Sequence, residues 1–338
     1  MDRKCPGRYG RAMASRPNKL TDRPGLPDEP VTDVLADVLD AMRLATLMHG
    51  RFELGAPWGI RFPECPGAHI VIVARGSARL EVEGVEGAIV LSAGDLALFP
   101  HGGGHTLRDA EGSPLHTLGH GECQRARGVG PIRLGGEGVR TTLVSGSFRL
   151  GAAPRTPLFE GLPRVIHVTA DDAATSPSLA PIVQLLITES ASSSPGATVI
   201  MSRLADILFV QALRTHIAAS QCHEHGLCAL ADPQLRKALS LIHERPSEPW
   251  TVESLATAVA LSRSSFAARF STIVGEPPLE YLARWRMTKA AQFLRESELA
   301  LSEVAESIGY QSEASFNRAF KRWGGVTPGA YRRDHRRG

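Results

Sequence analysis

The last hundred residues of the chain contain an internal duplication, and this feature constrains the fold more than any other. Serine, phenylalanine, proline and tyrosine residues recur at a separation of 50 positions. The pairs are Ser262 and Ser312, Phe266 and Phe316, Phe270 and Phe320, Pro278 and Pro328, and Tyr281 and Tyr331. A repeat of this length predicts two copies of one supersecondary unit.

Each copy is predicted to contain a short helix, a tight turn and a longer helix. Thr251 and Ser302 are expected to cap the short helices, and Ser262 and Ser312 the longer ones. The two phenylalanines of each longer helix lie four residues apart, so both rings should face the core. The outer faces keep small, polar or basic side chains. This arrangement predicts two helix-turn-helix units, against the alternative of a plain helical bundle with solvated charged faces.

The segment between the copies is predicted to hold them at a fixed distance. Pro277 and Pro278 should end the first long helix, because proline cannot continue a helix and disfavours it in the preceding residue. The apolar pattern from Leu279 to Leu294 favours one long connecting helix. Two reading heads on one face of a duplex would enter successive major grooves, about 34 Å apart.

The duplicated region resembles the AraC/XylS family of bacterial transcription regulators. The resemblance rests on Gly275-Glu-Pro-Pro-Leu-Glu-Tyr281, on Ile308-Gly-Tyr-Gln-Ser312-Glu-Ala-Ser-Phe316 and on Thr327-Pro328-Gly-Ala-Tyr331. It implies a DNA-binding domain over residues 233–333 with two helix-turn-helix units, fused to a variable sensing or dimerising domain. The DNA-contacting positions that it implies are Arg263, Ser264, Ala267, Ala268, Arg286, Glu313, Ala314, Asn317, Arg318 and Lys321.

The second of the two longer helices carries the better set of base-reading side chains. Arg318 matches guanine, Asn317 matches adenine, and Glu313 can accept a hydrogen bond from cytosine. Lys321 is expected at a phosphate. The small residues Ser264, Ala267 and Ala268 predict weaker reading by the first helix, and Arg286 resembles a phosphate contact of the family.

The N-terminal half is predicted to be rich in short strands. Residues 1–30 have no periodicity and are expected to be a disordered extension. Val31 to Met48 favours a short amphipathic helix. The β-rich runs that follow, separated by Gly- and Pro-bearing turns, predict a small barrel or jelly roll over 31–175. The whole chain is therefore expected to be α+β, with an all-α C-terminal domain.

Two histidines of this half stand in cupin-like motifs. Gly94 to His105 matches the second cupin motif, and His69 stands where the first motif usually has its glutamate. The two upstream histidines of the first motif are missing. The resemblance is therefore to the cupin-like sensing domain that often precedes an AraC-type DNA-binding domain.

Three residues, His69, His105 and Cys65, are the candidates for an effector pocket. A divalent metal at the two histidines, with Cys65 or Glu64 as third ligand, is left open beside ordinary hydrogen-bonded core histidines. Cys65 is weighed as a redox trigger, because a nearby imidazolium would lower the pKa of its thiol, against an inert thiol.

Two apolar helical patterns follow, near 178–192 and 196–219. A helix as apolar as the second must be covered, and residues 176–220 are predicted to form a homodimer contact. Residues 221–232 are expected to link the domains. The zinc-binding residue types from Cys222 to Cys228 are weighed there against a linker that holds no metal. Asp232 and Pro233 should begin the next helix as N-cap and first residue.

Composition and charge agree with a protein that meets DNA at one end. At 338 residues the chain should form two domains. From Asp232 onward 16 Lys and Arg stand against 12 Asp and Glu, a balance of +4, whereas residues 31–229 carry 15 against 19, a balance of −4. Five cysteines, an odd number, predict reduced thiols rather than a disulfide framework. Without a long apolar run or signal core, the expected location is the cytoplasm.

The sequence thus predicts a sequence-specific transcription regulator that responds to a small molecule, a metal or an oxidant. The expected partners are double-stranded DNA, RNA polymerase, a second copy of the chain and an unidentified effector, with no membrane. A cupin-type oxygenase or isomerase with a helical appendage is the alternative, and it needs a facial set of metal ligands. A third interpretation is an architectural DNA binder without sequence preference. Whether transcription is activated or repressed is left open.

Overall fold

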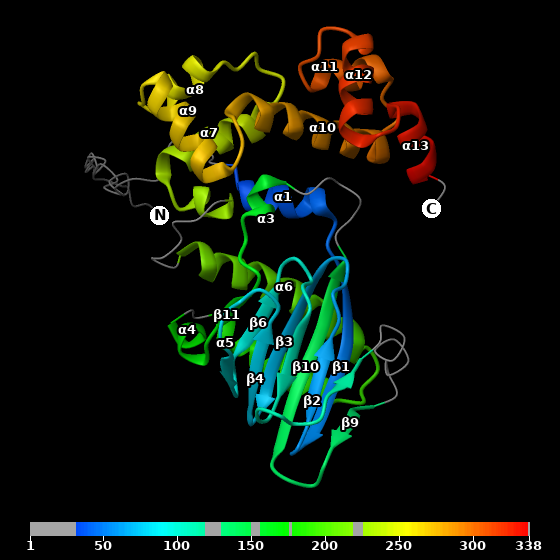
Figure 1. Cartoon of the computed structure of the whole chain (residues 1–338). Helices are drawn as coiled ribbons and strands as arrows, with labels where there is room; N and C mark the ends of the chain where they lie inside the picture. The colour runs from blue at the N-terminus through cyan, green and yellow to red at the C-terminus, as the bar shows by residue number, and fades with distance from the viewer. Residues whose placement is uncertain (1–31, 119–129, 150–155, 176–177, 219–225, 337–338) are drawn as a thin grey trace, which may run out of the picture. The chain divides into compact units, whose positions relative to one another are not determined.

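Short strands of the N-terminal half pair into two facing sheets. The computed structural model describes residues 32–118, 130–149, 156–175, 178–218 and 226–336 (Figure 1). One sheet has the strand order β11-β6-β3-β10-β1-β9 and the other β5-β4-β7-β2-β8. The strands are β1 (Ala45–Gly55), β2 (Gly59–Phe62), β3 (Ala68–Arg75), β4 (Ser77–Val82), β5 (Ile89–Ser92), β6 (Leu96–Phe99), β7 (His105–Arg108), β8 (His116–Thr117), β9 (Ile132–Gly135), β10 (Arg140–Arg149) and β11 (Ile166–Val168).

Helices flank this sandwich and make up the C-terminal half. They are α1 (Val34–Met42), α3 (Pro157–Glu160), α4 (Ala170–Thr175), α5 (Leu179–Ser190), α6 (Ala197–Ala218), a 3₁₀ turn η1 (Gly226–Leu230), α7 (Pro233–Glu244), α8 (Val252–Ala258), α9 (Arg263–Val274), α10 (Pro278–Glu296), α11 (Leu301–Ser307), α12 (Glu313–Gly324) and α13 (Pro328–Arg336). The predicted α+β class, with a β-rich N-terminal domain and an all-α C-terminal domain, is confirmed.

Period-two alternation in the central strands divides the apolar side chains between two layers. In β3, Ile70 and Ile72 belong to the core cluster that includes α5 and α6, whereas Val71 and Val73 belong to the cluster inside the sandwich. Such a strand is buried on both faces, which is why it reads as an almost continuous apolar run. His69 shares the parity of Val71, so the same alternation turns its ring inward.

A β-bulge partway along β1 changes which of its alternating side chains point into the sandwich. Met48 pairs with Gly146 and Gly50 pairs with Ser145, so His49 is the extra residue between them. Before the bulge Met48 packs on the helical side, and after it Phe52 and Leu54 pack inside the sandwich. One inserted residue shifts a period-two pattern to the opposite face. The helix predicted over residues 31–48 is shorter in the structure: α1 spans Val34–Met42, where Arg43 takes a left-handed backbone conformation, and β1 begins at Ala45.

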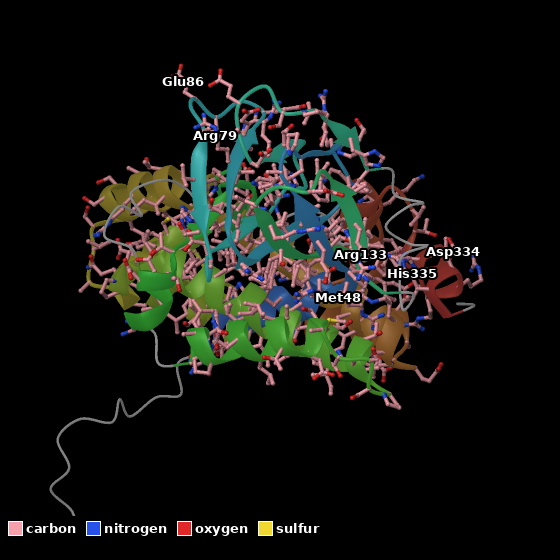
Figure 2. The ribbon with its side chains drawn as sticks, turned by 90° about the horizontal axis from the view of Figure 1, so that it is seen from below. Met48, Arg79, Glu86, Arg133, Asp334 and His335 are labelled. Atoms are coloured by element: carbon pink, nitrogen blue, oxygen red, sulfur yellow. The ribbon has the colours of Figure 1, made fainter. Side chains whose placement is uncertain are left out.

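The antiparallel pair α5 and α6 covers the outer face of the six-stranded sheet (Figure 1). Leu204, Ala205, Leu208 and Phe209 of α6 are buried, and the ring of Phe209 lies 4.8 Å from that of Phe148 on β10. In Figure 2 the side chain of Met48 points into the layer between β1 and these helices. Among the described residues no helix is long and apolar enough to span a membrane.

The C-terminal half contains the two predicted helix-turn-helix units, α8–α9 and α11–α12. Ser262 and Ser312 cap the longer helices as predicted, and so does Thr251 for α8. The prediction of Ser302 as a cap is wrong, because Ala300 holds that position and its backbone N–H donates to Glu303 at 2.6 Å. The short helices begin 49 residues apart and the longer ones 50, so the second turn is one residue longer than the first.

The predicted long connecting helix is α10, which begins one residue before the predicted Leu279 and ends two residues after the predicted Leu294. Asp232 and Pro233 begin α7 as predicted, the carboxylate of Asp232 accepting from the N–H groups of Gln234 and Leu235. Between the domains Cys228 is buried and disulfide-bonded, which corrects the expectation of reduced thiols at this position. Its bonding partner lies outside the described residues, as do Cys222, His223 and His225 of the considered zinc site and the extension over residues 1–30. Cys228 cannot serve as a thiolate ligand in this state.

Candidate nucleic-acid interface

The outer face of α12 is exposed along its whole length. Glu313, Ala314, Arg318 and Lys321 are exposed, and Asn317 is half-buried. On the opposite face the buried rings of Phe316 and Phe320 lie 5.7 Å apart and anchor the helix. The exposed positions and the buried positions of α12 each recur every three or four residues, which gives the helix one polar face and one apolar face. All five predicted reading positions of α12 therefore share one surface of this helix.

Polar contacts on this face are sparse. The side-chain amide of Asn317 donates to a Glu313 oxygen at 3.5 Å, one helical turn away, which is the limit of a hydrogen bond. No hydrogen bond or ion pair to another described residue is recorded for the side chains of Arg318 and Lys321. The two cations remain available for an external acceptor. A guanidinium presents two parallel donors, which suits a guanine edge or a phosphate.

The first unit presents a smaller and less charged surface. Arg263, Ser264 and Ala268 of α9 are exposed and Ala267 is half-buried. Ser264 shares a 3.3 Å contact with the cap Ser262. Arg269, also on α9, is turned back to the start of α7, where it contacts Asp232 at 2.5 Å and Gln234 at 2.8 Å. Among the exposed positions of this helix, only Arg263 offers a cation on the predicted DNA side.

Arg286 makes different contacts from those that the family resemblance implies. Its Nε donates to the carbonyl of Pro246 at 2.6 Å, and its Nη2 donates to the carbonyl of Glu248 at 2.8 Å. The side chain is half-buried, and burial lowers the pKa of its guanidinium. Two donor nitrogens are thus committed to backbone carbonyls, and they fasten α10 to the loop between α7 and α8. The phosphate contact that the family resemblance implies stays a prediction.

Inside the sandwich, the predicted histidines meet and are joined by a third. His69 and His105 have ring centroids 4.9 Å apart, and both are buried. Nε2 of His69 bonds to Ser145 Oγ at 3.0 Å, and that hydroxyl lies 3.4 Å from Nδ1 of His49. Nε2 of His49 reaches Ser147 at 3.0 Å. His49 is not among the predicted residues, because the sequence pattern reveals neither the start of β1 nor the bulge at this position.

Aromatic rings hold His105 on both sides. Phe99 stacks on its ring at 3.8 Å, and Phe62 stacks at 4.9 Å. Its Nδ1 lies 3.0 Å from the Gly103 carbonyl, whereas its buried Nε2 has no hydrogen-bond partner among the described residues. Burial lowers the pKa of His105 to about 4, although the Gly103 carbonyl opposes the shift. The imidazole is therefore neutral at physiological pH.

Cys65 lies in the segment before β3, and its backbone N–H donates to the Gly102 carbonyl. The backbones approach closely here: Gly102 has φ of +65°, and a Cβ on it would lie 2.2 Å from the Cys65 carbonyl oxygen. Burial, and then the charge of Glu64, raises the pKa of the Cys65 thiol. The proposed activation by an imidazolium is not supported, since this shift disfavours the thiolate and His105 is neutral.

The sandwich residues that the structure describes do not form a set of metal ligands. A catalytic or structural site needs three or four convergent donors. Among the described residues no group of three His, Cys, Asp or Glu side chains is placed to hold a metal ion. The described neighbours of His69 are a serine hydroxyl, two further imidazoles and phenylalanine rings, which cannot bind a metal, and no carboxylate is among them. The described residues therefore do not form there the facial ligand set that the metalloenzyme alternative requires.

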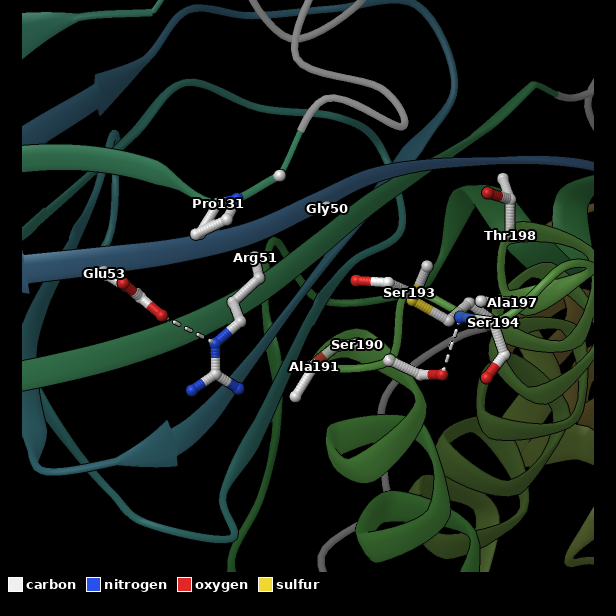
Figure 3. Close-up of a pocket in the computed structure, with 13 residues that line it drawn as sticks. Gly50, Arg51, Glu53, Pro131, Ser190, Ala191, Ser193, Ser194, Ala197 and Thr198 are labelled. Carbon is white, nitrogen blue, oxygen red and sulfur yellow. Dashed lines mark hydrogen bonds and ion pairs between the residues drawn. The ribbon is translucent and has the colours of Figure 1, made fainter.

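A separate cleft of about 340 Å³ lies outside the sandwich, between β1, the start of β9 and the turn from α5 to α6 (Figure 3). Serine residues from Ser190 to Ser194 line one wall. Arg51 lines the other, where its Nε lies 3.4 Å from Glu53, and Glu53 also contacts Arg133 at 3.1 Å. These arginines lower the pKa of the Glu53 carboxyl, Arg133 most strongly. The cation at Arg51 therefore already has a local counter-charge.

Two exposed reading helices with separate cores, joined by one helix and attached to a β-sandwich, define a DNA-binding regulator with a second domain. Comparison with known proteins agrees. The Cupin family profile matches residues 33–218, and the Helix-turn-helix domain profile matches residues 255–334. An AraC-like transcription regulator of Streptomyces lividans is 37% identical over 307 residues, 89% of this chain and 98% of that protein.

Two further relatives are similar over most of the chain. The HTH-type transcriptional regulator AlkR of Acinetobacter baylyi is 34% identical over 78% of this chain and 87% of its own length. The HTH-type transcriptional regulator MtrA of Neisseria gonorrhoeae is 28% identical over 89% and 98%. The chain belongs to the AraC-like transcription regulators and binds DNA through its helix-turn-helix domain.

Proposed function

We propose that α12 reads the sequence of the operator and that α9 mainly positions the protein on it. Arg318 would make a bidentate contact to guanine, Asn317 would pair with adenine, and Glu313 would accept from cytosine. Lys321 would contact a phosphate. The proposal is supported by one observation above all: the exposed face of α12 carries two cations that have no partner among the described residues, beside an amide and a carboxylate.

The small side chains of α9 support the assignment of base reading mainly to α12 and of positioning to α9. Ser264, Ala267 and Ala268 can contact thymine methyl groups or accept one hydrogen bond, and Arg263 can reach a phosphate or a base edge. A site read in this way has one strongly specified segment and one weakly specified segment. Successive major grooves place the two segments about 10 base pairs apart.

Selection of bound sequences from a random pool of duplexes tests this proposal. Full-length protein should enrich one motif with a sharp segment and a degenerate segment on the same face of the helix. Random duplexes of equal length, titrated over a range of salt, provide the baseline of non-specific binding. Equal affinity for enriched and random duplexes would instead support the architectural binder without sequence preference.

We also propose that two copies associate through α5 and α6. Four exposed large apolar side chains lie on this helix pair: Leu185, Val199, Ile200 and Ile207. Ile200 and Ile207 are seven residues apart and so share one face of α6, opposite the face buried on the sheet. A self-complementary apolar face of this kind favours a two-fold homodimer. Such a dimer would bring two DNA-binding domains to one operator.

The N-terminal domain is proposed to bind a small-molecule effector near His69 and His105. The support is the buried Nε2 of His105, which has no hydrogen-bond partner among the described residues, in a ring 4.9 Å from that of His69. Because Phe62 and Phe99 stack on the His105 ring, a polar molecule that satisfies this nitrogen would have to enter the sandwich in the plane of the ring. Binding would therefore couple to packing inside the sandwich. Cys65 borders the site through its pairing with Gly102.

The remaining partner and location follow from the function. A regulator that binds promoter DNA acts beside RNA polymerase and where the chromosome lies, so we infer contact with the polymerase and a cytoplasmic location. The assignment as a regulator rather than an enzyme is supported by the names of the relatives, which are transcription regulators. Thermal-shift screening of small molecules against wild-type protein and His105→Phe would identify effectors that depend on this site.

A further inference from the structure

The two helix-turn-helix units, called here the first reading head (α8 and α9) and the second reading head (α11 and α12), have separate apolar cores. The first head packs Phe266, Phe270 and Trp285 in one cluster, and the second packs Met287, Phe316 and Phe320 in another. Both clusters use α10, and the change from one to the other falls between Trp285 and Met287. Arg286 is the residue at this change. Apolar packing thus fixes each head internally, but the angle between the heads depends on what else joins them.

One side of this joint is an open cleft. It has a volume of about 360 Å³ and is lined by residues of both heads, among them Glu276, Arg284, Tyr310, Arg322 and Trp323. The ion pair between Arg284 and Glu276, at 2.7 Å, connects α10 to the end of α9, which is internal to the first head. The residues of this cleft therefore do not hold the two heads to each other by a recorded hydrogen bond or ion pair.

The backbones of the two heads meet beside Arg286, whose hydrogen bonds go to the first head. The guanidinium donates to the carbonyls of Pro246 and Glu248, in the loop that leads into the first head. That loop is itself braced, since Trp250 Nε1 donates to the Arg245 carbonyl at 3.0 Å. Between the two acceptors, the backbone of Ser247 lies directly against Gly309, in the turn of the second head.

Gly309 shows how close this approach is. A Cβ at this position would lie 2.5 Å from the Ser247 carbonyl oxygen and 3.0 Å from Nη2 of Arg286. The residue also has φ of +83°, a conformation that glycine adopts without strain. The turn of the second head, the loop of the first and the guanidinium therefore meet at one point with no room for a side chain.

We propose that Arg286 sets the distance and angle between the two reading heads, and that it thereby determines which spacing between operator segments the protein accepts. This inference rests on the proposed reading of DNA by both heads. A guanidinium suits the task because its planar donors reach two carbonyls in fixed directions, whereas an ammonium acts as a point charge on a flexible stem. Arg286 is a positioning residue, and no contact with DNA is required of it.

The test measures binding of full-length protein to duplexes that carry the selected operator, and to duplexes with one or two base pairs inserted or removed between its two segments. Wild-type protein should prefer the selected spacing by at least about tenfold, as expected for rigidly held heads. Arg286→Ala and Arg286→Lys should both bind the altered spacings nearly as well as the selected one. Circular dichroism and thermal unfolding establish that both variants fold.

Arg332→Ala is the matched control. The Nη2 of Arg332 also donates to a backbone carbonyl, that of Leu299 at 2.6 Å, but both residues belong to the second head. The spacing preference should survive this change. Loss of the preference in Arg332→Ala as well would overturn the proposal, because any loosened head would then have the same effect.

Other outcomes separate this inference from its premise. If wild-type protein selects no motif, the proposed reading of DNA fails. If wild-type protein shows a sharp spacing preference and both Arg286 variants keep it, the positioning role fails and the premise stands. A phosphate contact predicts another pattern: Arg286→Ala would weaken binding equally at every spacing and reduce its salt dependence, whereas Arg286→Lys would bind almost as wild type does.

Discussion

His243 of α7 lies between Asp37 of α1 and Tyr281 of α10, in one chain of hydrogen bonds. Its Nδ1 is 3.1 Å from an Asp37 oxygen and its Nε2 is 2.7 Å from the Tyr281 hydroxyl. The ring also stacks on Trp285 at 3.7 Å. Burial lowers the pKa of His243, although Asp37 opposes the shift. A neutral imidazole satisfies both contacts, with Nδ1–H donating to the carboxylate and Nε2 accepting from the phenol.

Asp37→Ala is expected to destabilise the protein by about 1–3 kcal/mol, because it leaves the buried Nδ1–H of His243 without an acceptor. Urea unfolding at pH 7 measures the change in free energy of unfolding. Asp40→Ala is the control, since Asp40 lies on the same helix but its side chain is exposed. Equal stability of the two variants would mean that water replaces the carboxylate at no cost.

His105 predicts a specific loss of stability in acid. Its pKa of about 4 in the folded protein is below the value near 6.5 of an exposed histidine. Between these values the unfolded chain binds more protons than the folded one, so the free energy of unfolding falls as pH decreases from about 6.5 to 4. Above pH 6.5 the contribution of His105 to stability is fully present. The difference corresponds to about 3 kcal/mol from this residue.

His105→Phe should remove that contribution while keeping the stacking between Phe62 and Phe99. The free energy of unfolding, measured by urea at several pH values, should then change less between pH 7 and 4 than it does in wild-type protein. His116→Gln is the control, because His116 is exposed and the acid sensitivity should persist. An unchanged pH profile in His105→Phe would show that other groups dominate.

The contrast between His69 and His49 shows what the sequence could predict about the sandwich. Glycine- and proline-bounded runs predicted its strands, and motif positions predicted that His69 and His105 would meet. His49 could not be found in this way, because its inward direction depends on the β-bulge, which only strand pairing reveals. The alternation Arg51, Phe52, Glu53, Leu54 does mark the part of the strand after the bulge, but it begins beyond Met48 and does not show where the preceding helix ends.

The C-terminal domain likewise has features that the sequence predicts and contacts that it does not. Caps, prolines and phenylalanine spacing predicted the helices of both units and the exposed faces of α9 and α12. The contacts of Arg286 were not predictable, since its acceptors are carbonyls 40 and 38 residues away and carry no side-chain signature. The N-cap position of Ala300 was not predictable, because alanine has no capping side chain. The predicted Ser302 lies 51 residues after Thr251, whereas Ala300 lies 49 residues after it, and the first turn is one residue shorter than the second.

Arg318→Ala is expected to weaken binding by about 1–3 kcal/mol on the selected operator and to relax preference at one base pair. The reason is that a bidentate arginine discriminates its base, whereas a phosphate contact does not. Competition binding against operators mutated at each position measures both effects. Lys321→Ala provides the comparison, with a uniform loss on all sequences and a smaller salt dependence. A uniform loss in Arg318→Ala too would contradict base reading by this residue.

Ile207→Asp tests the face of α6 that we assign to the dimer. Ile207 is 44% exposed in the single chain, so an aspartate there should be tolerated by the monomer, while two copies meeting across a two-fold axis would bury like charges. The dissociation constant of the dimer should rise about tenfold or more, as measured by analytical ultracentrifugation. Val139→Asp, which replaces an exposed valine outside α5 and α6, should leave the assembly unchanged.

Binding to a duplex with two operator copies should weaken in Ile207→Asp, because linked domains no longer raise each other's local concentration, whereas binding to a single copy should be retained. A variant that dissociates no more readily than wild type would place the interface elsewhere on the chain.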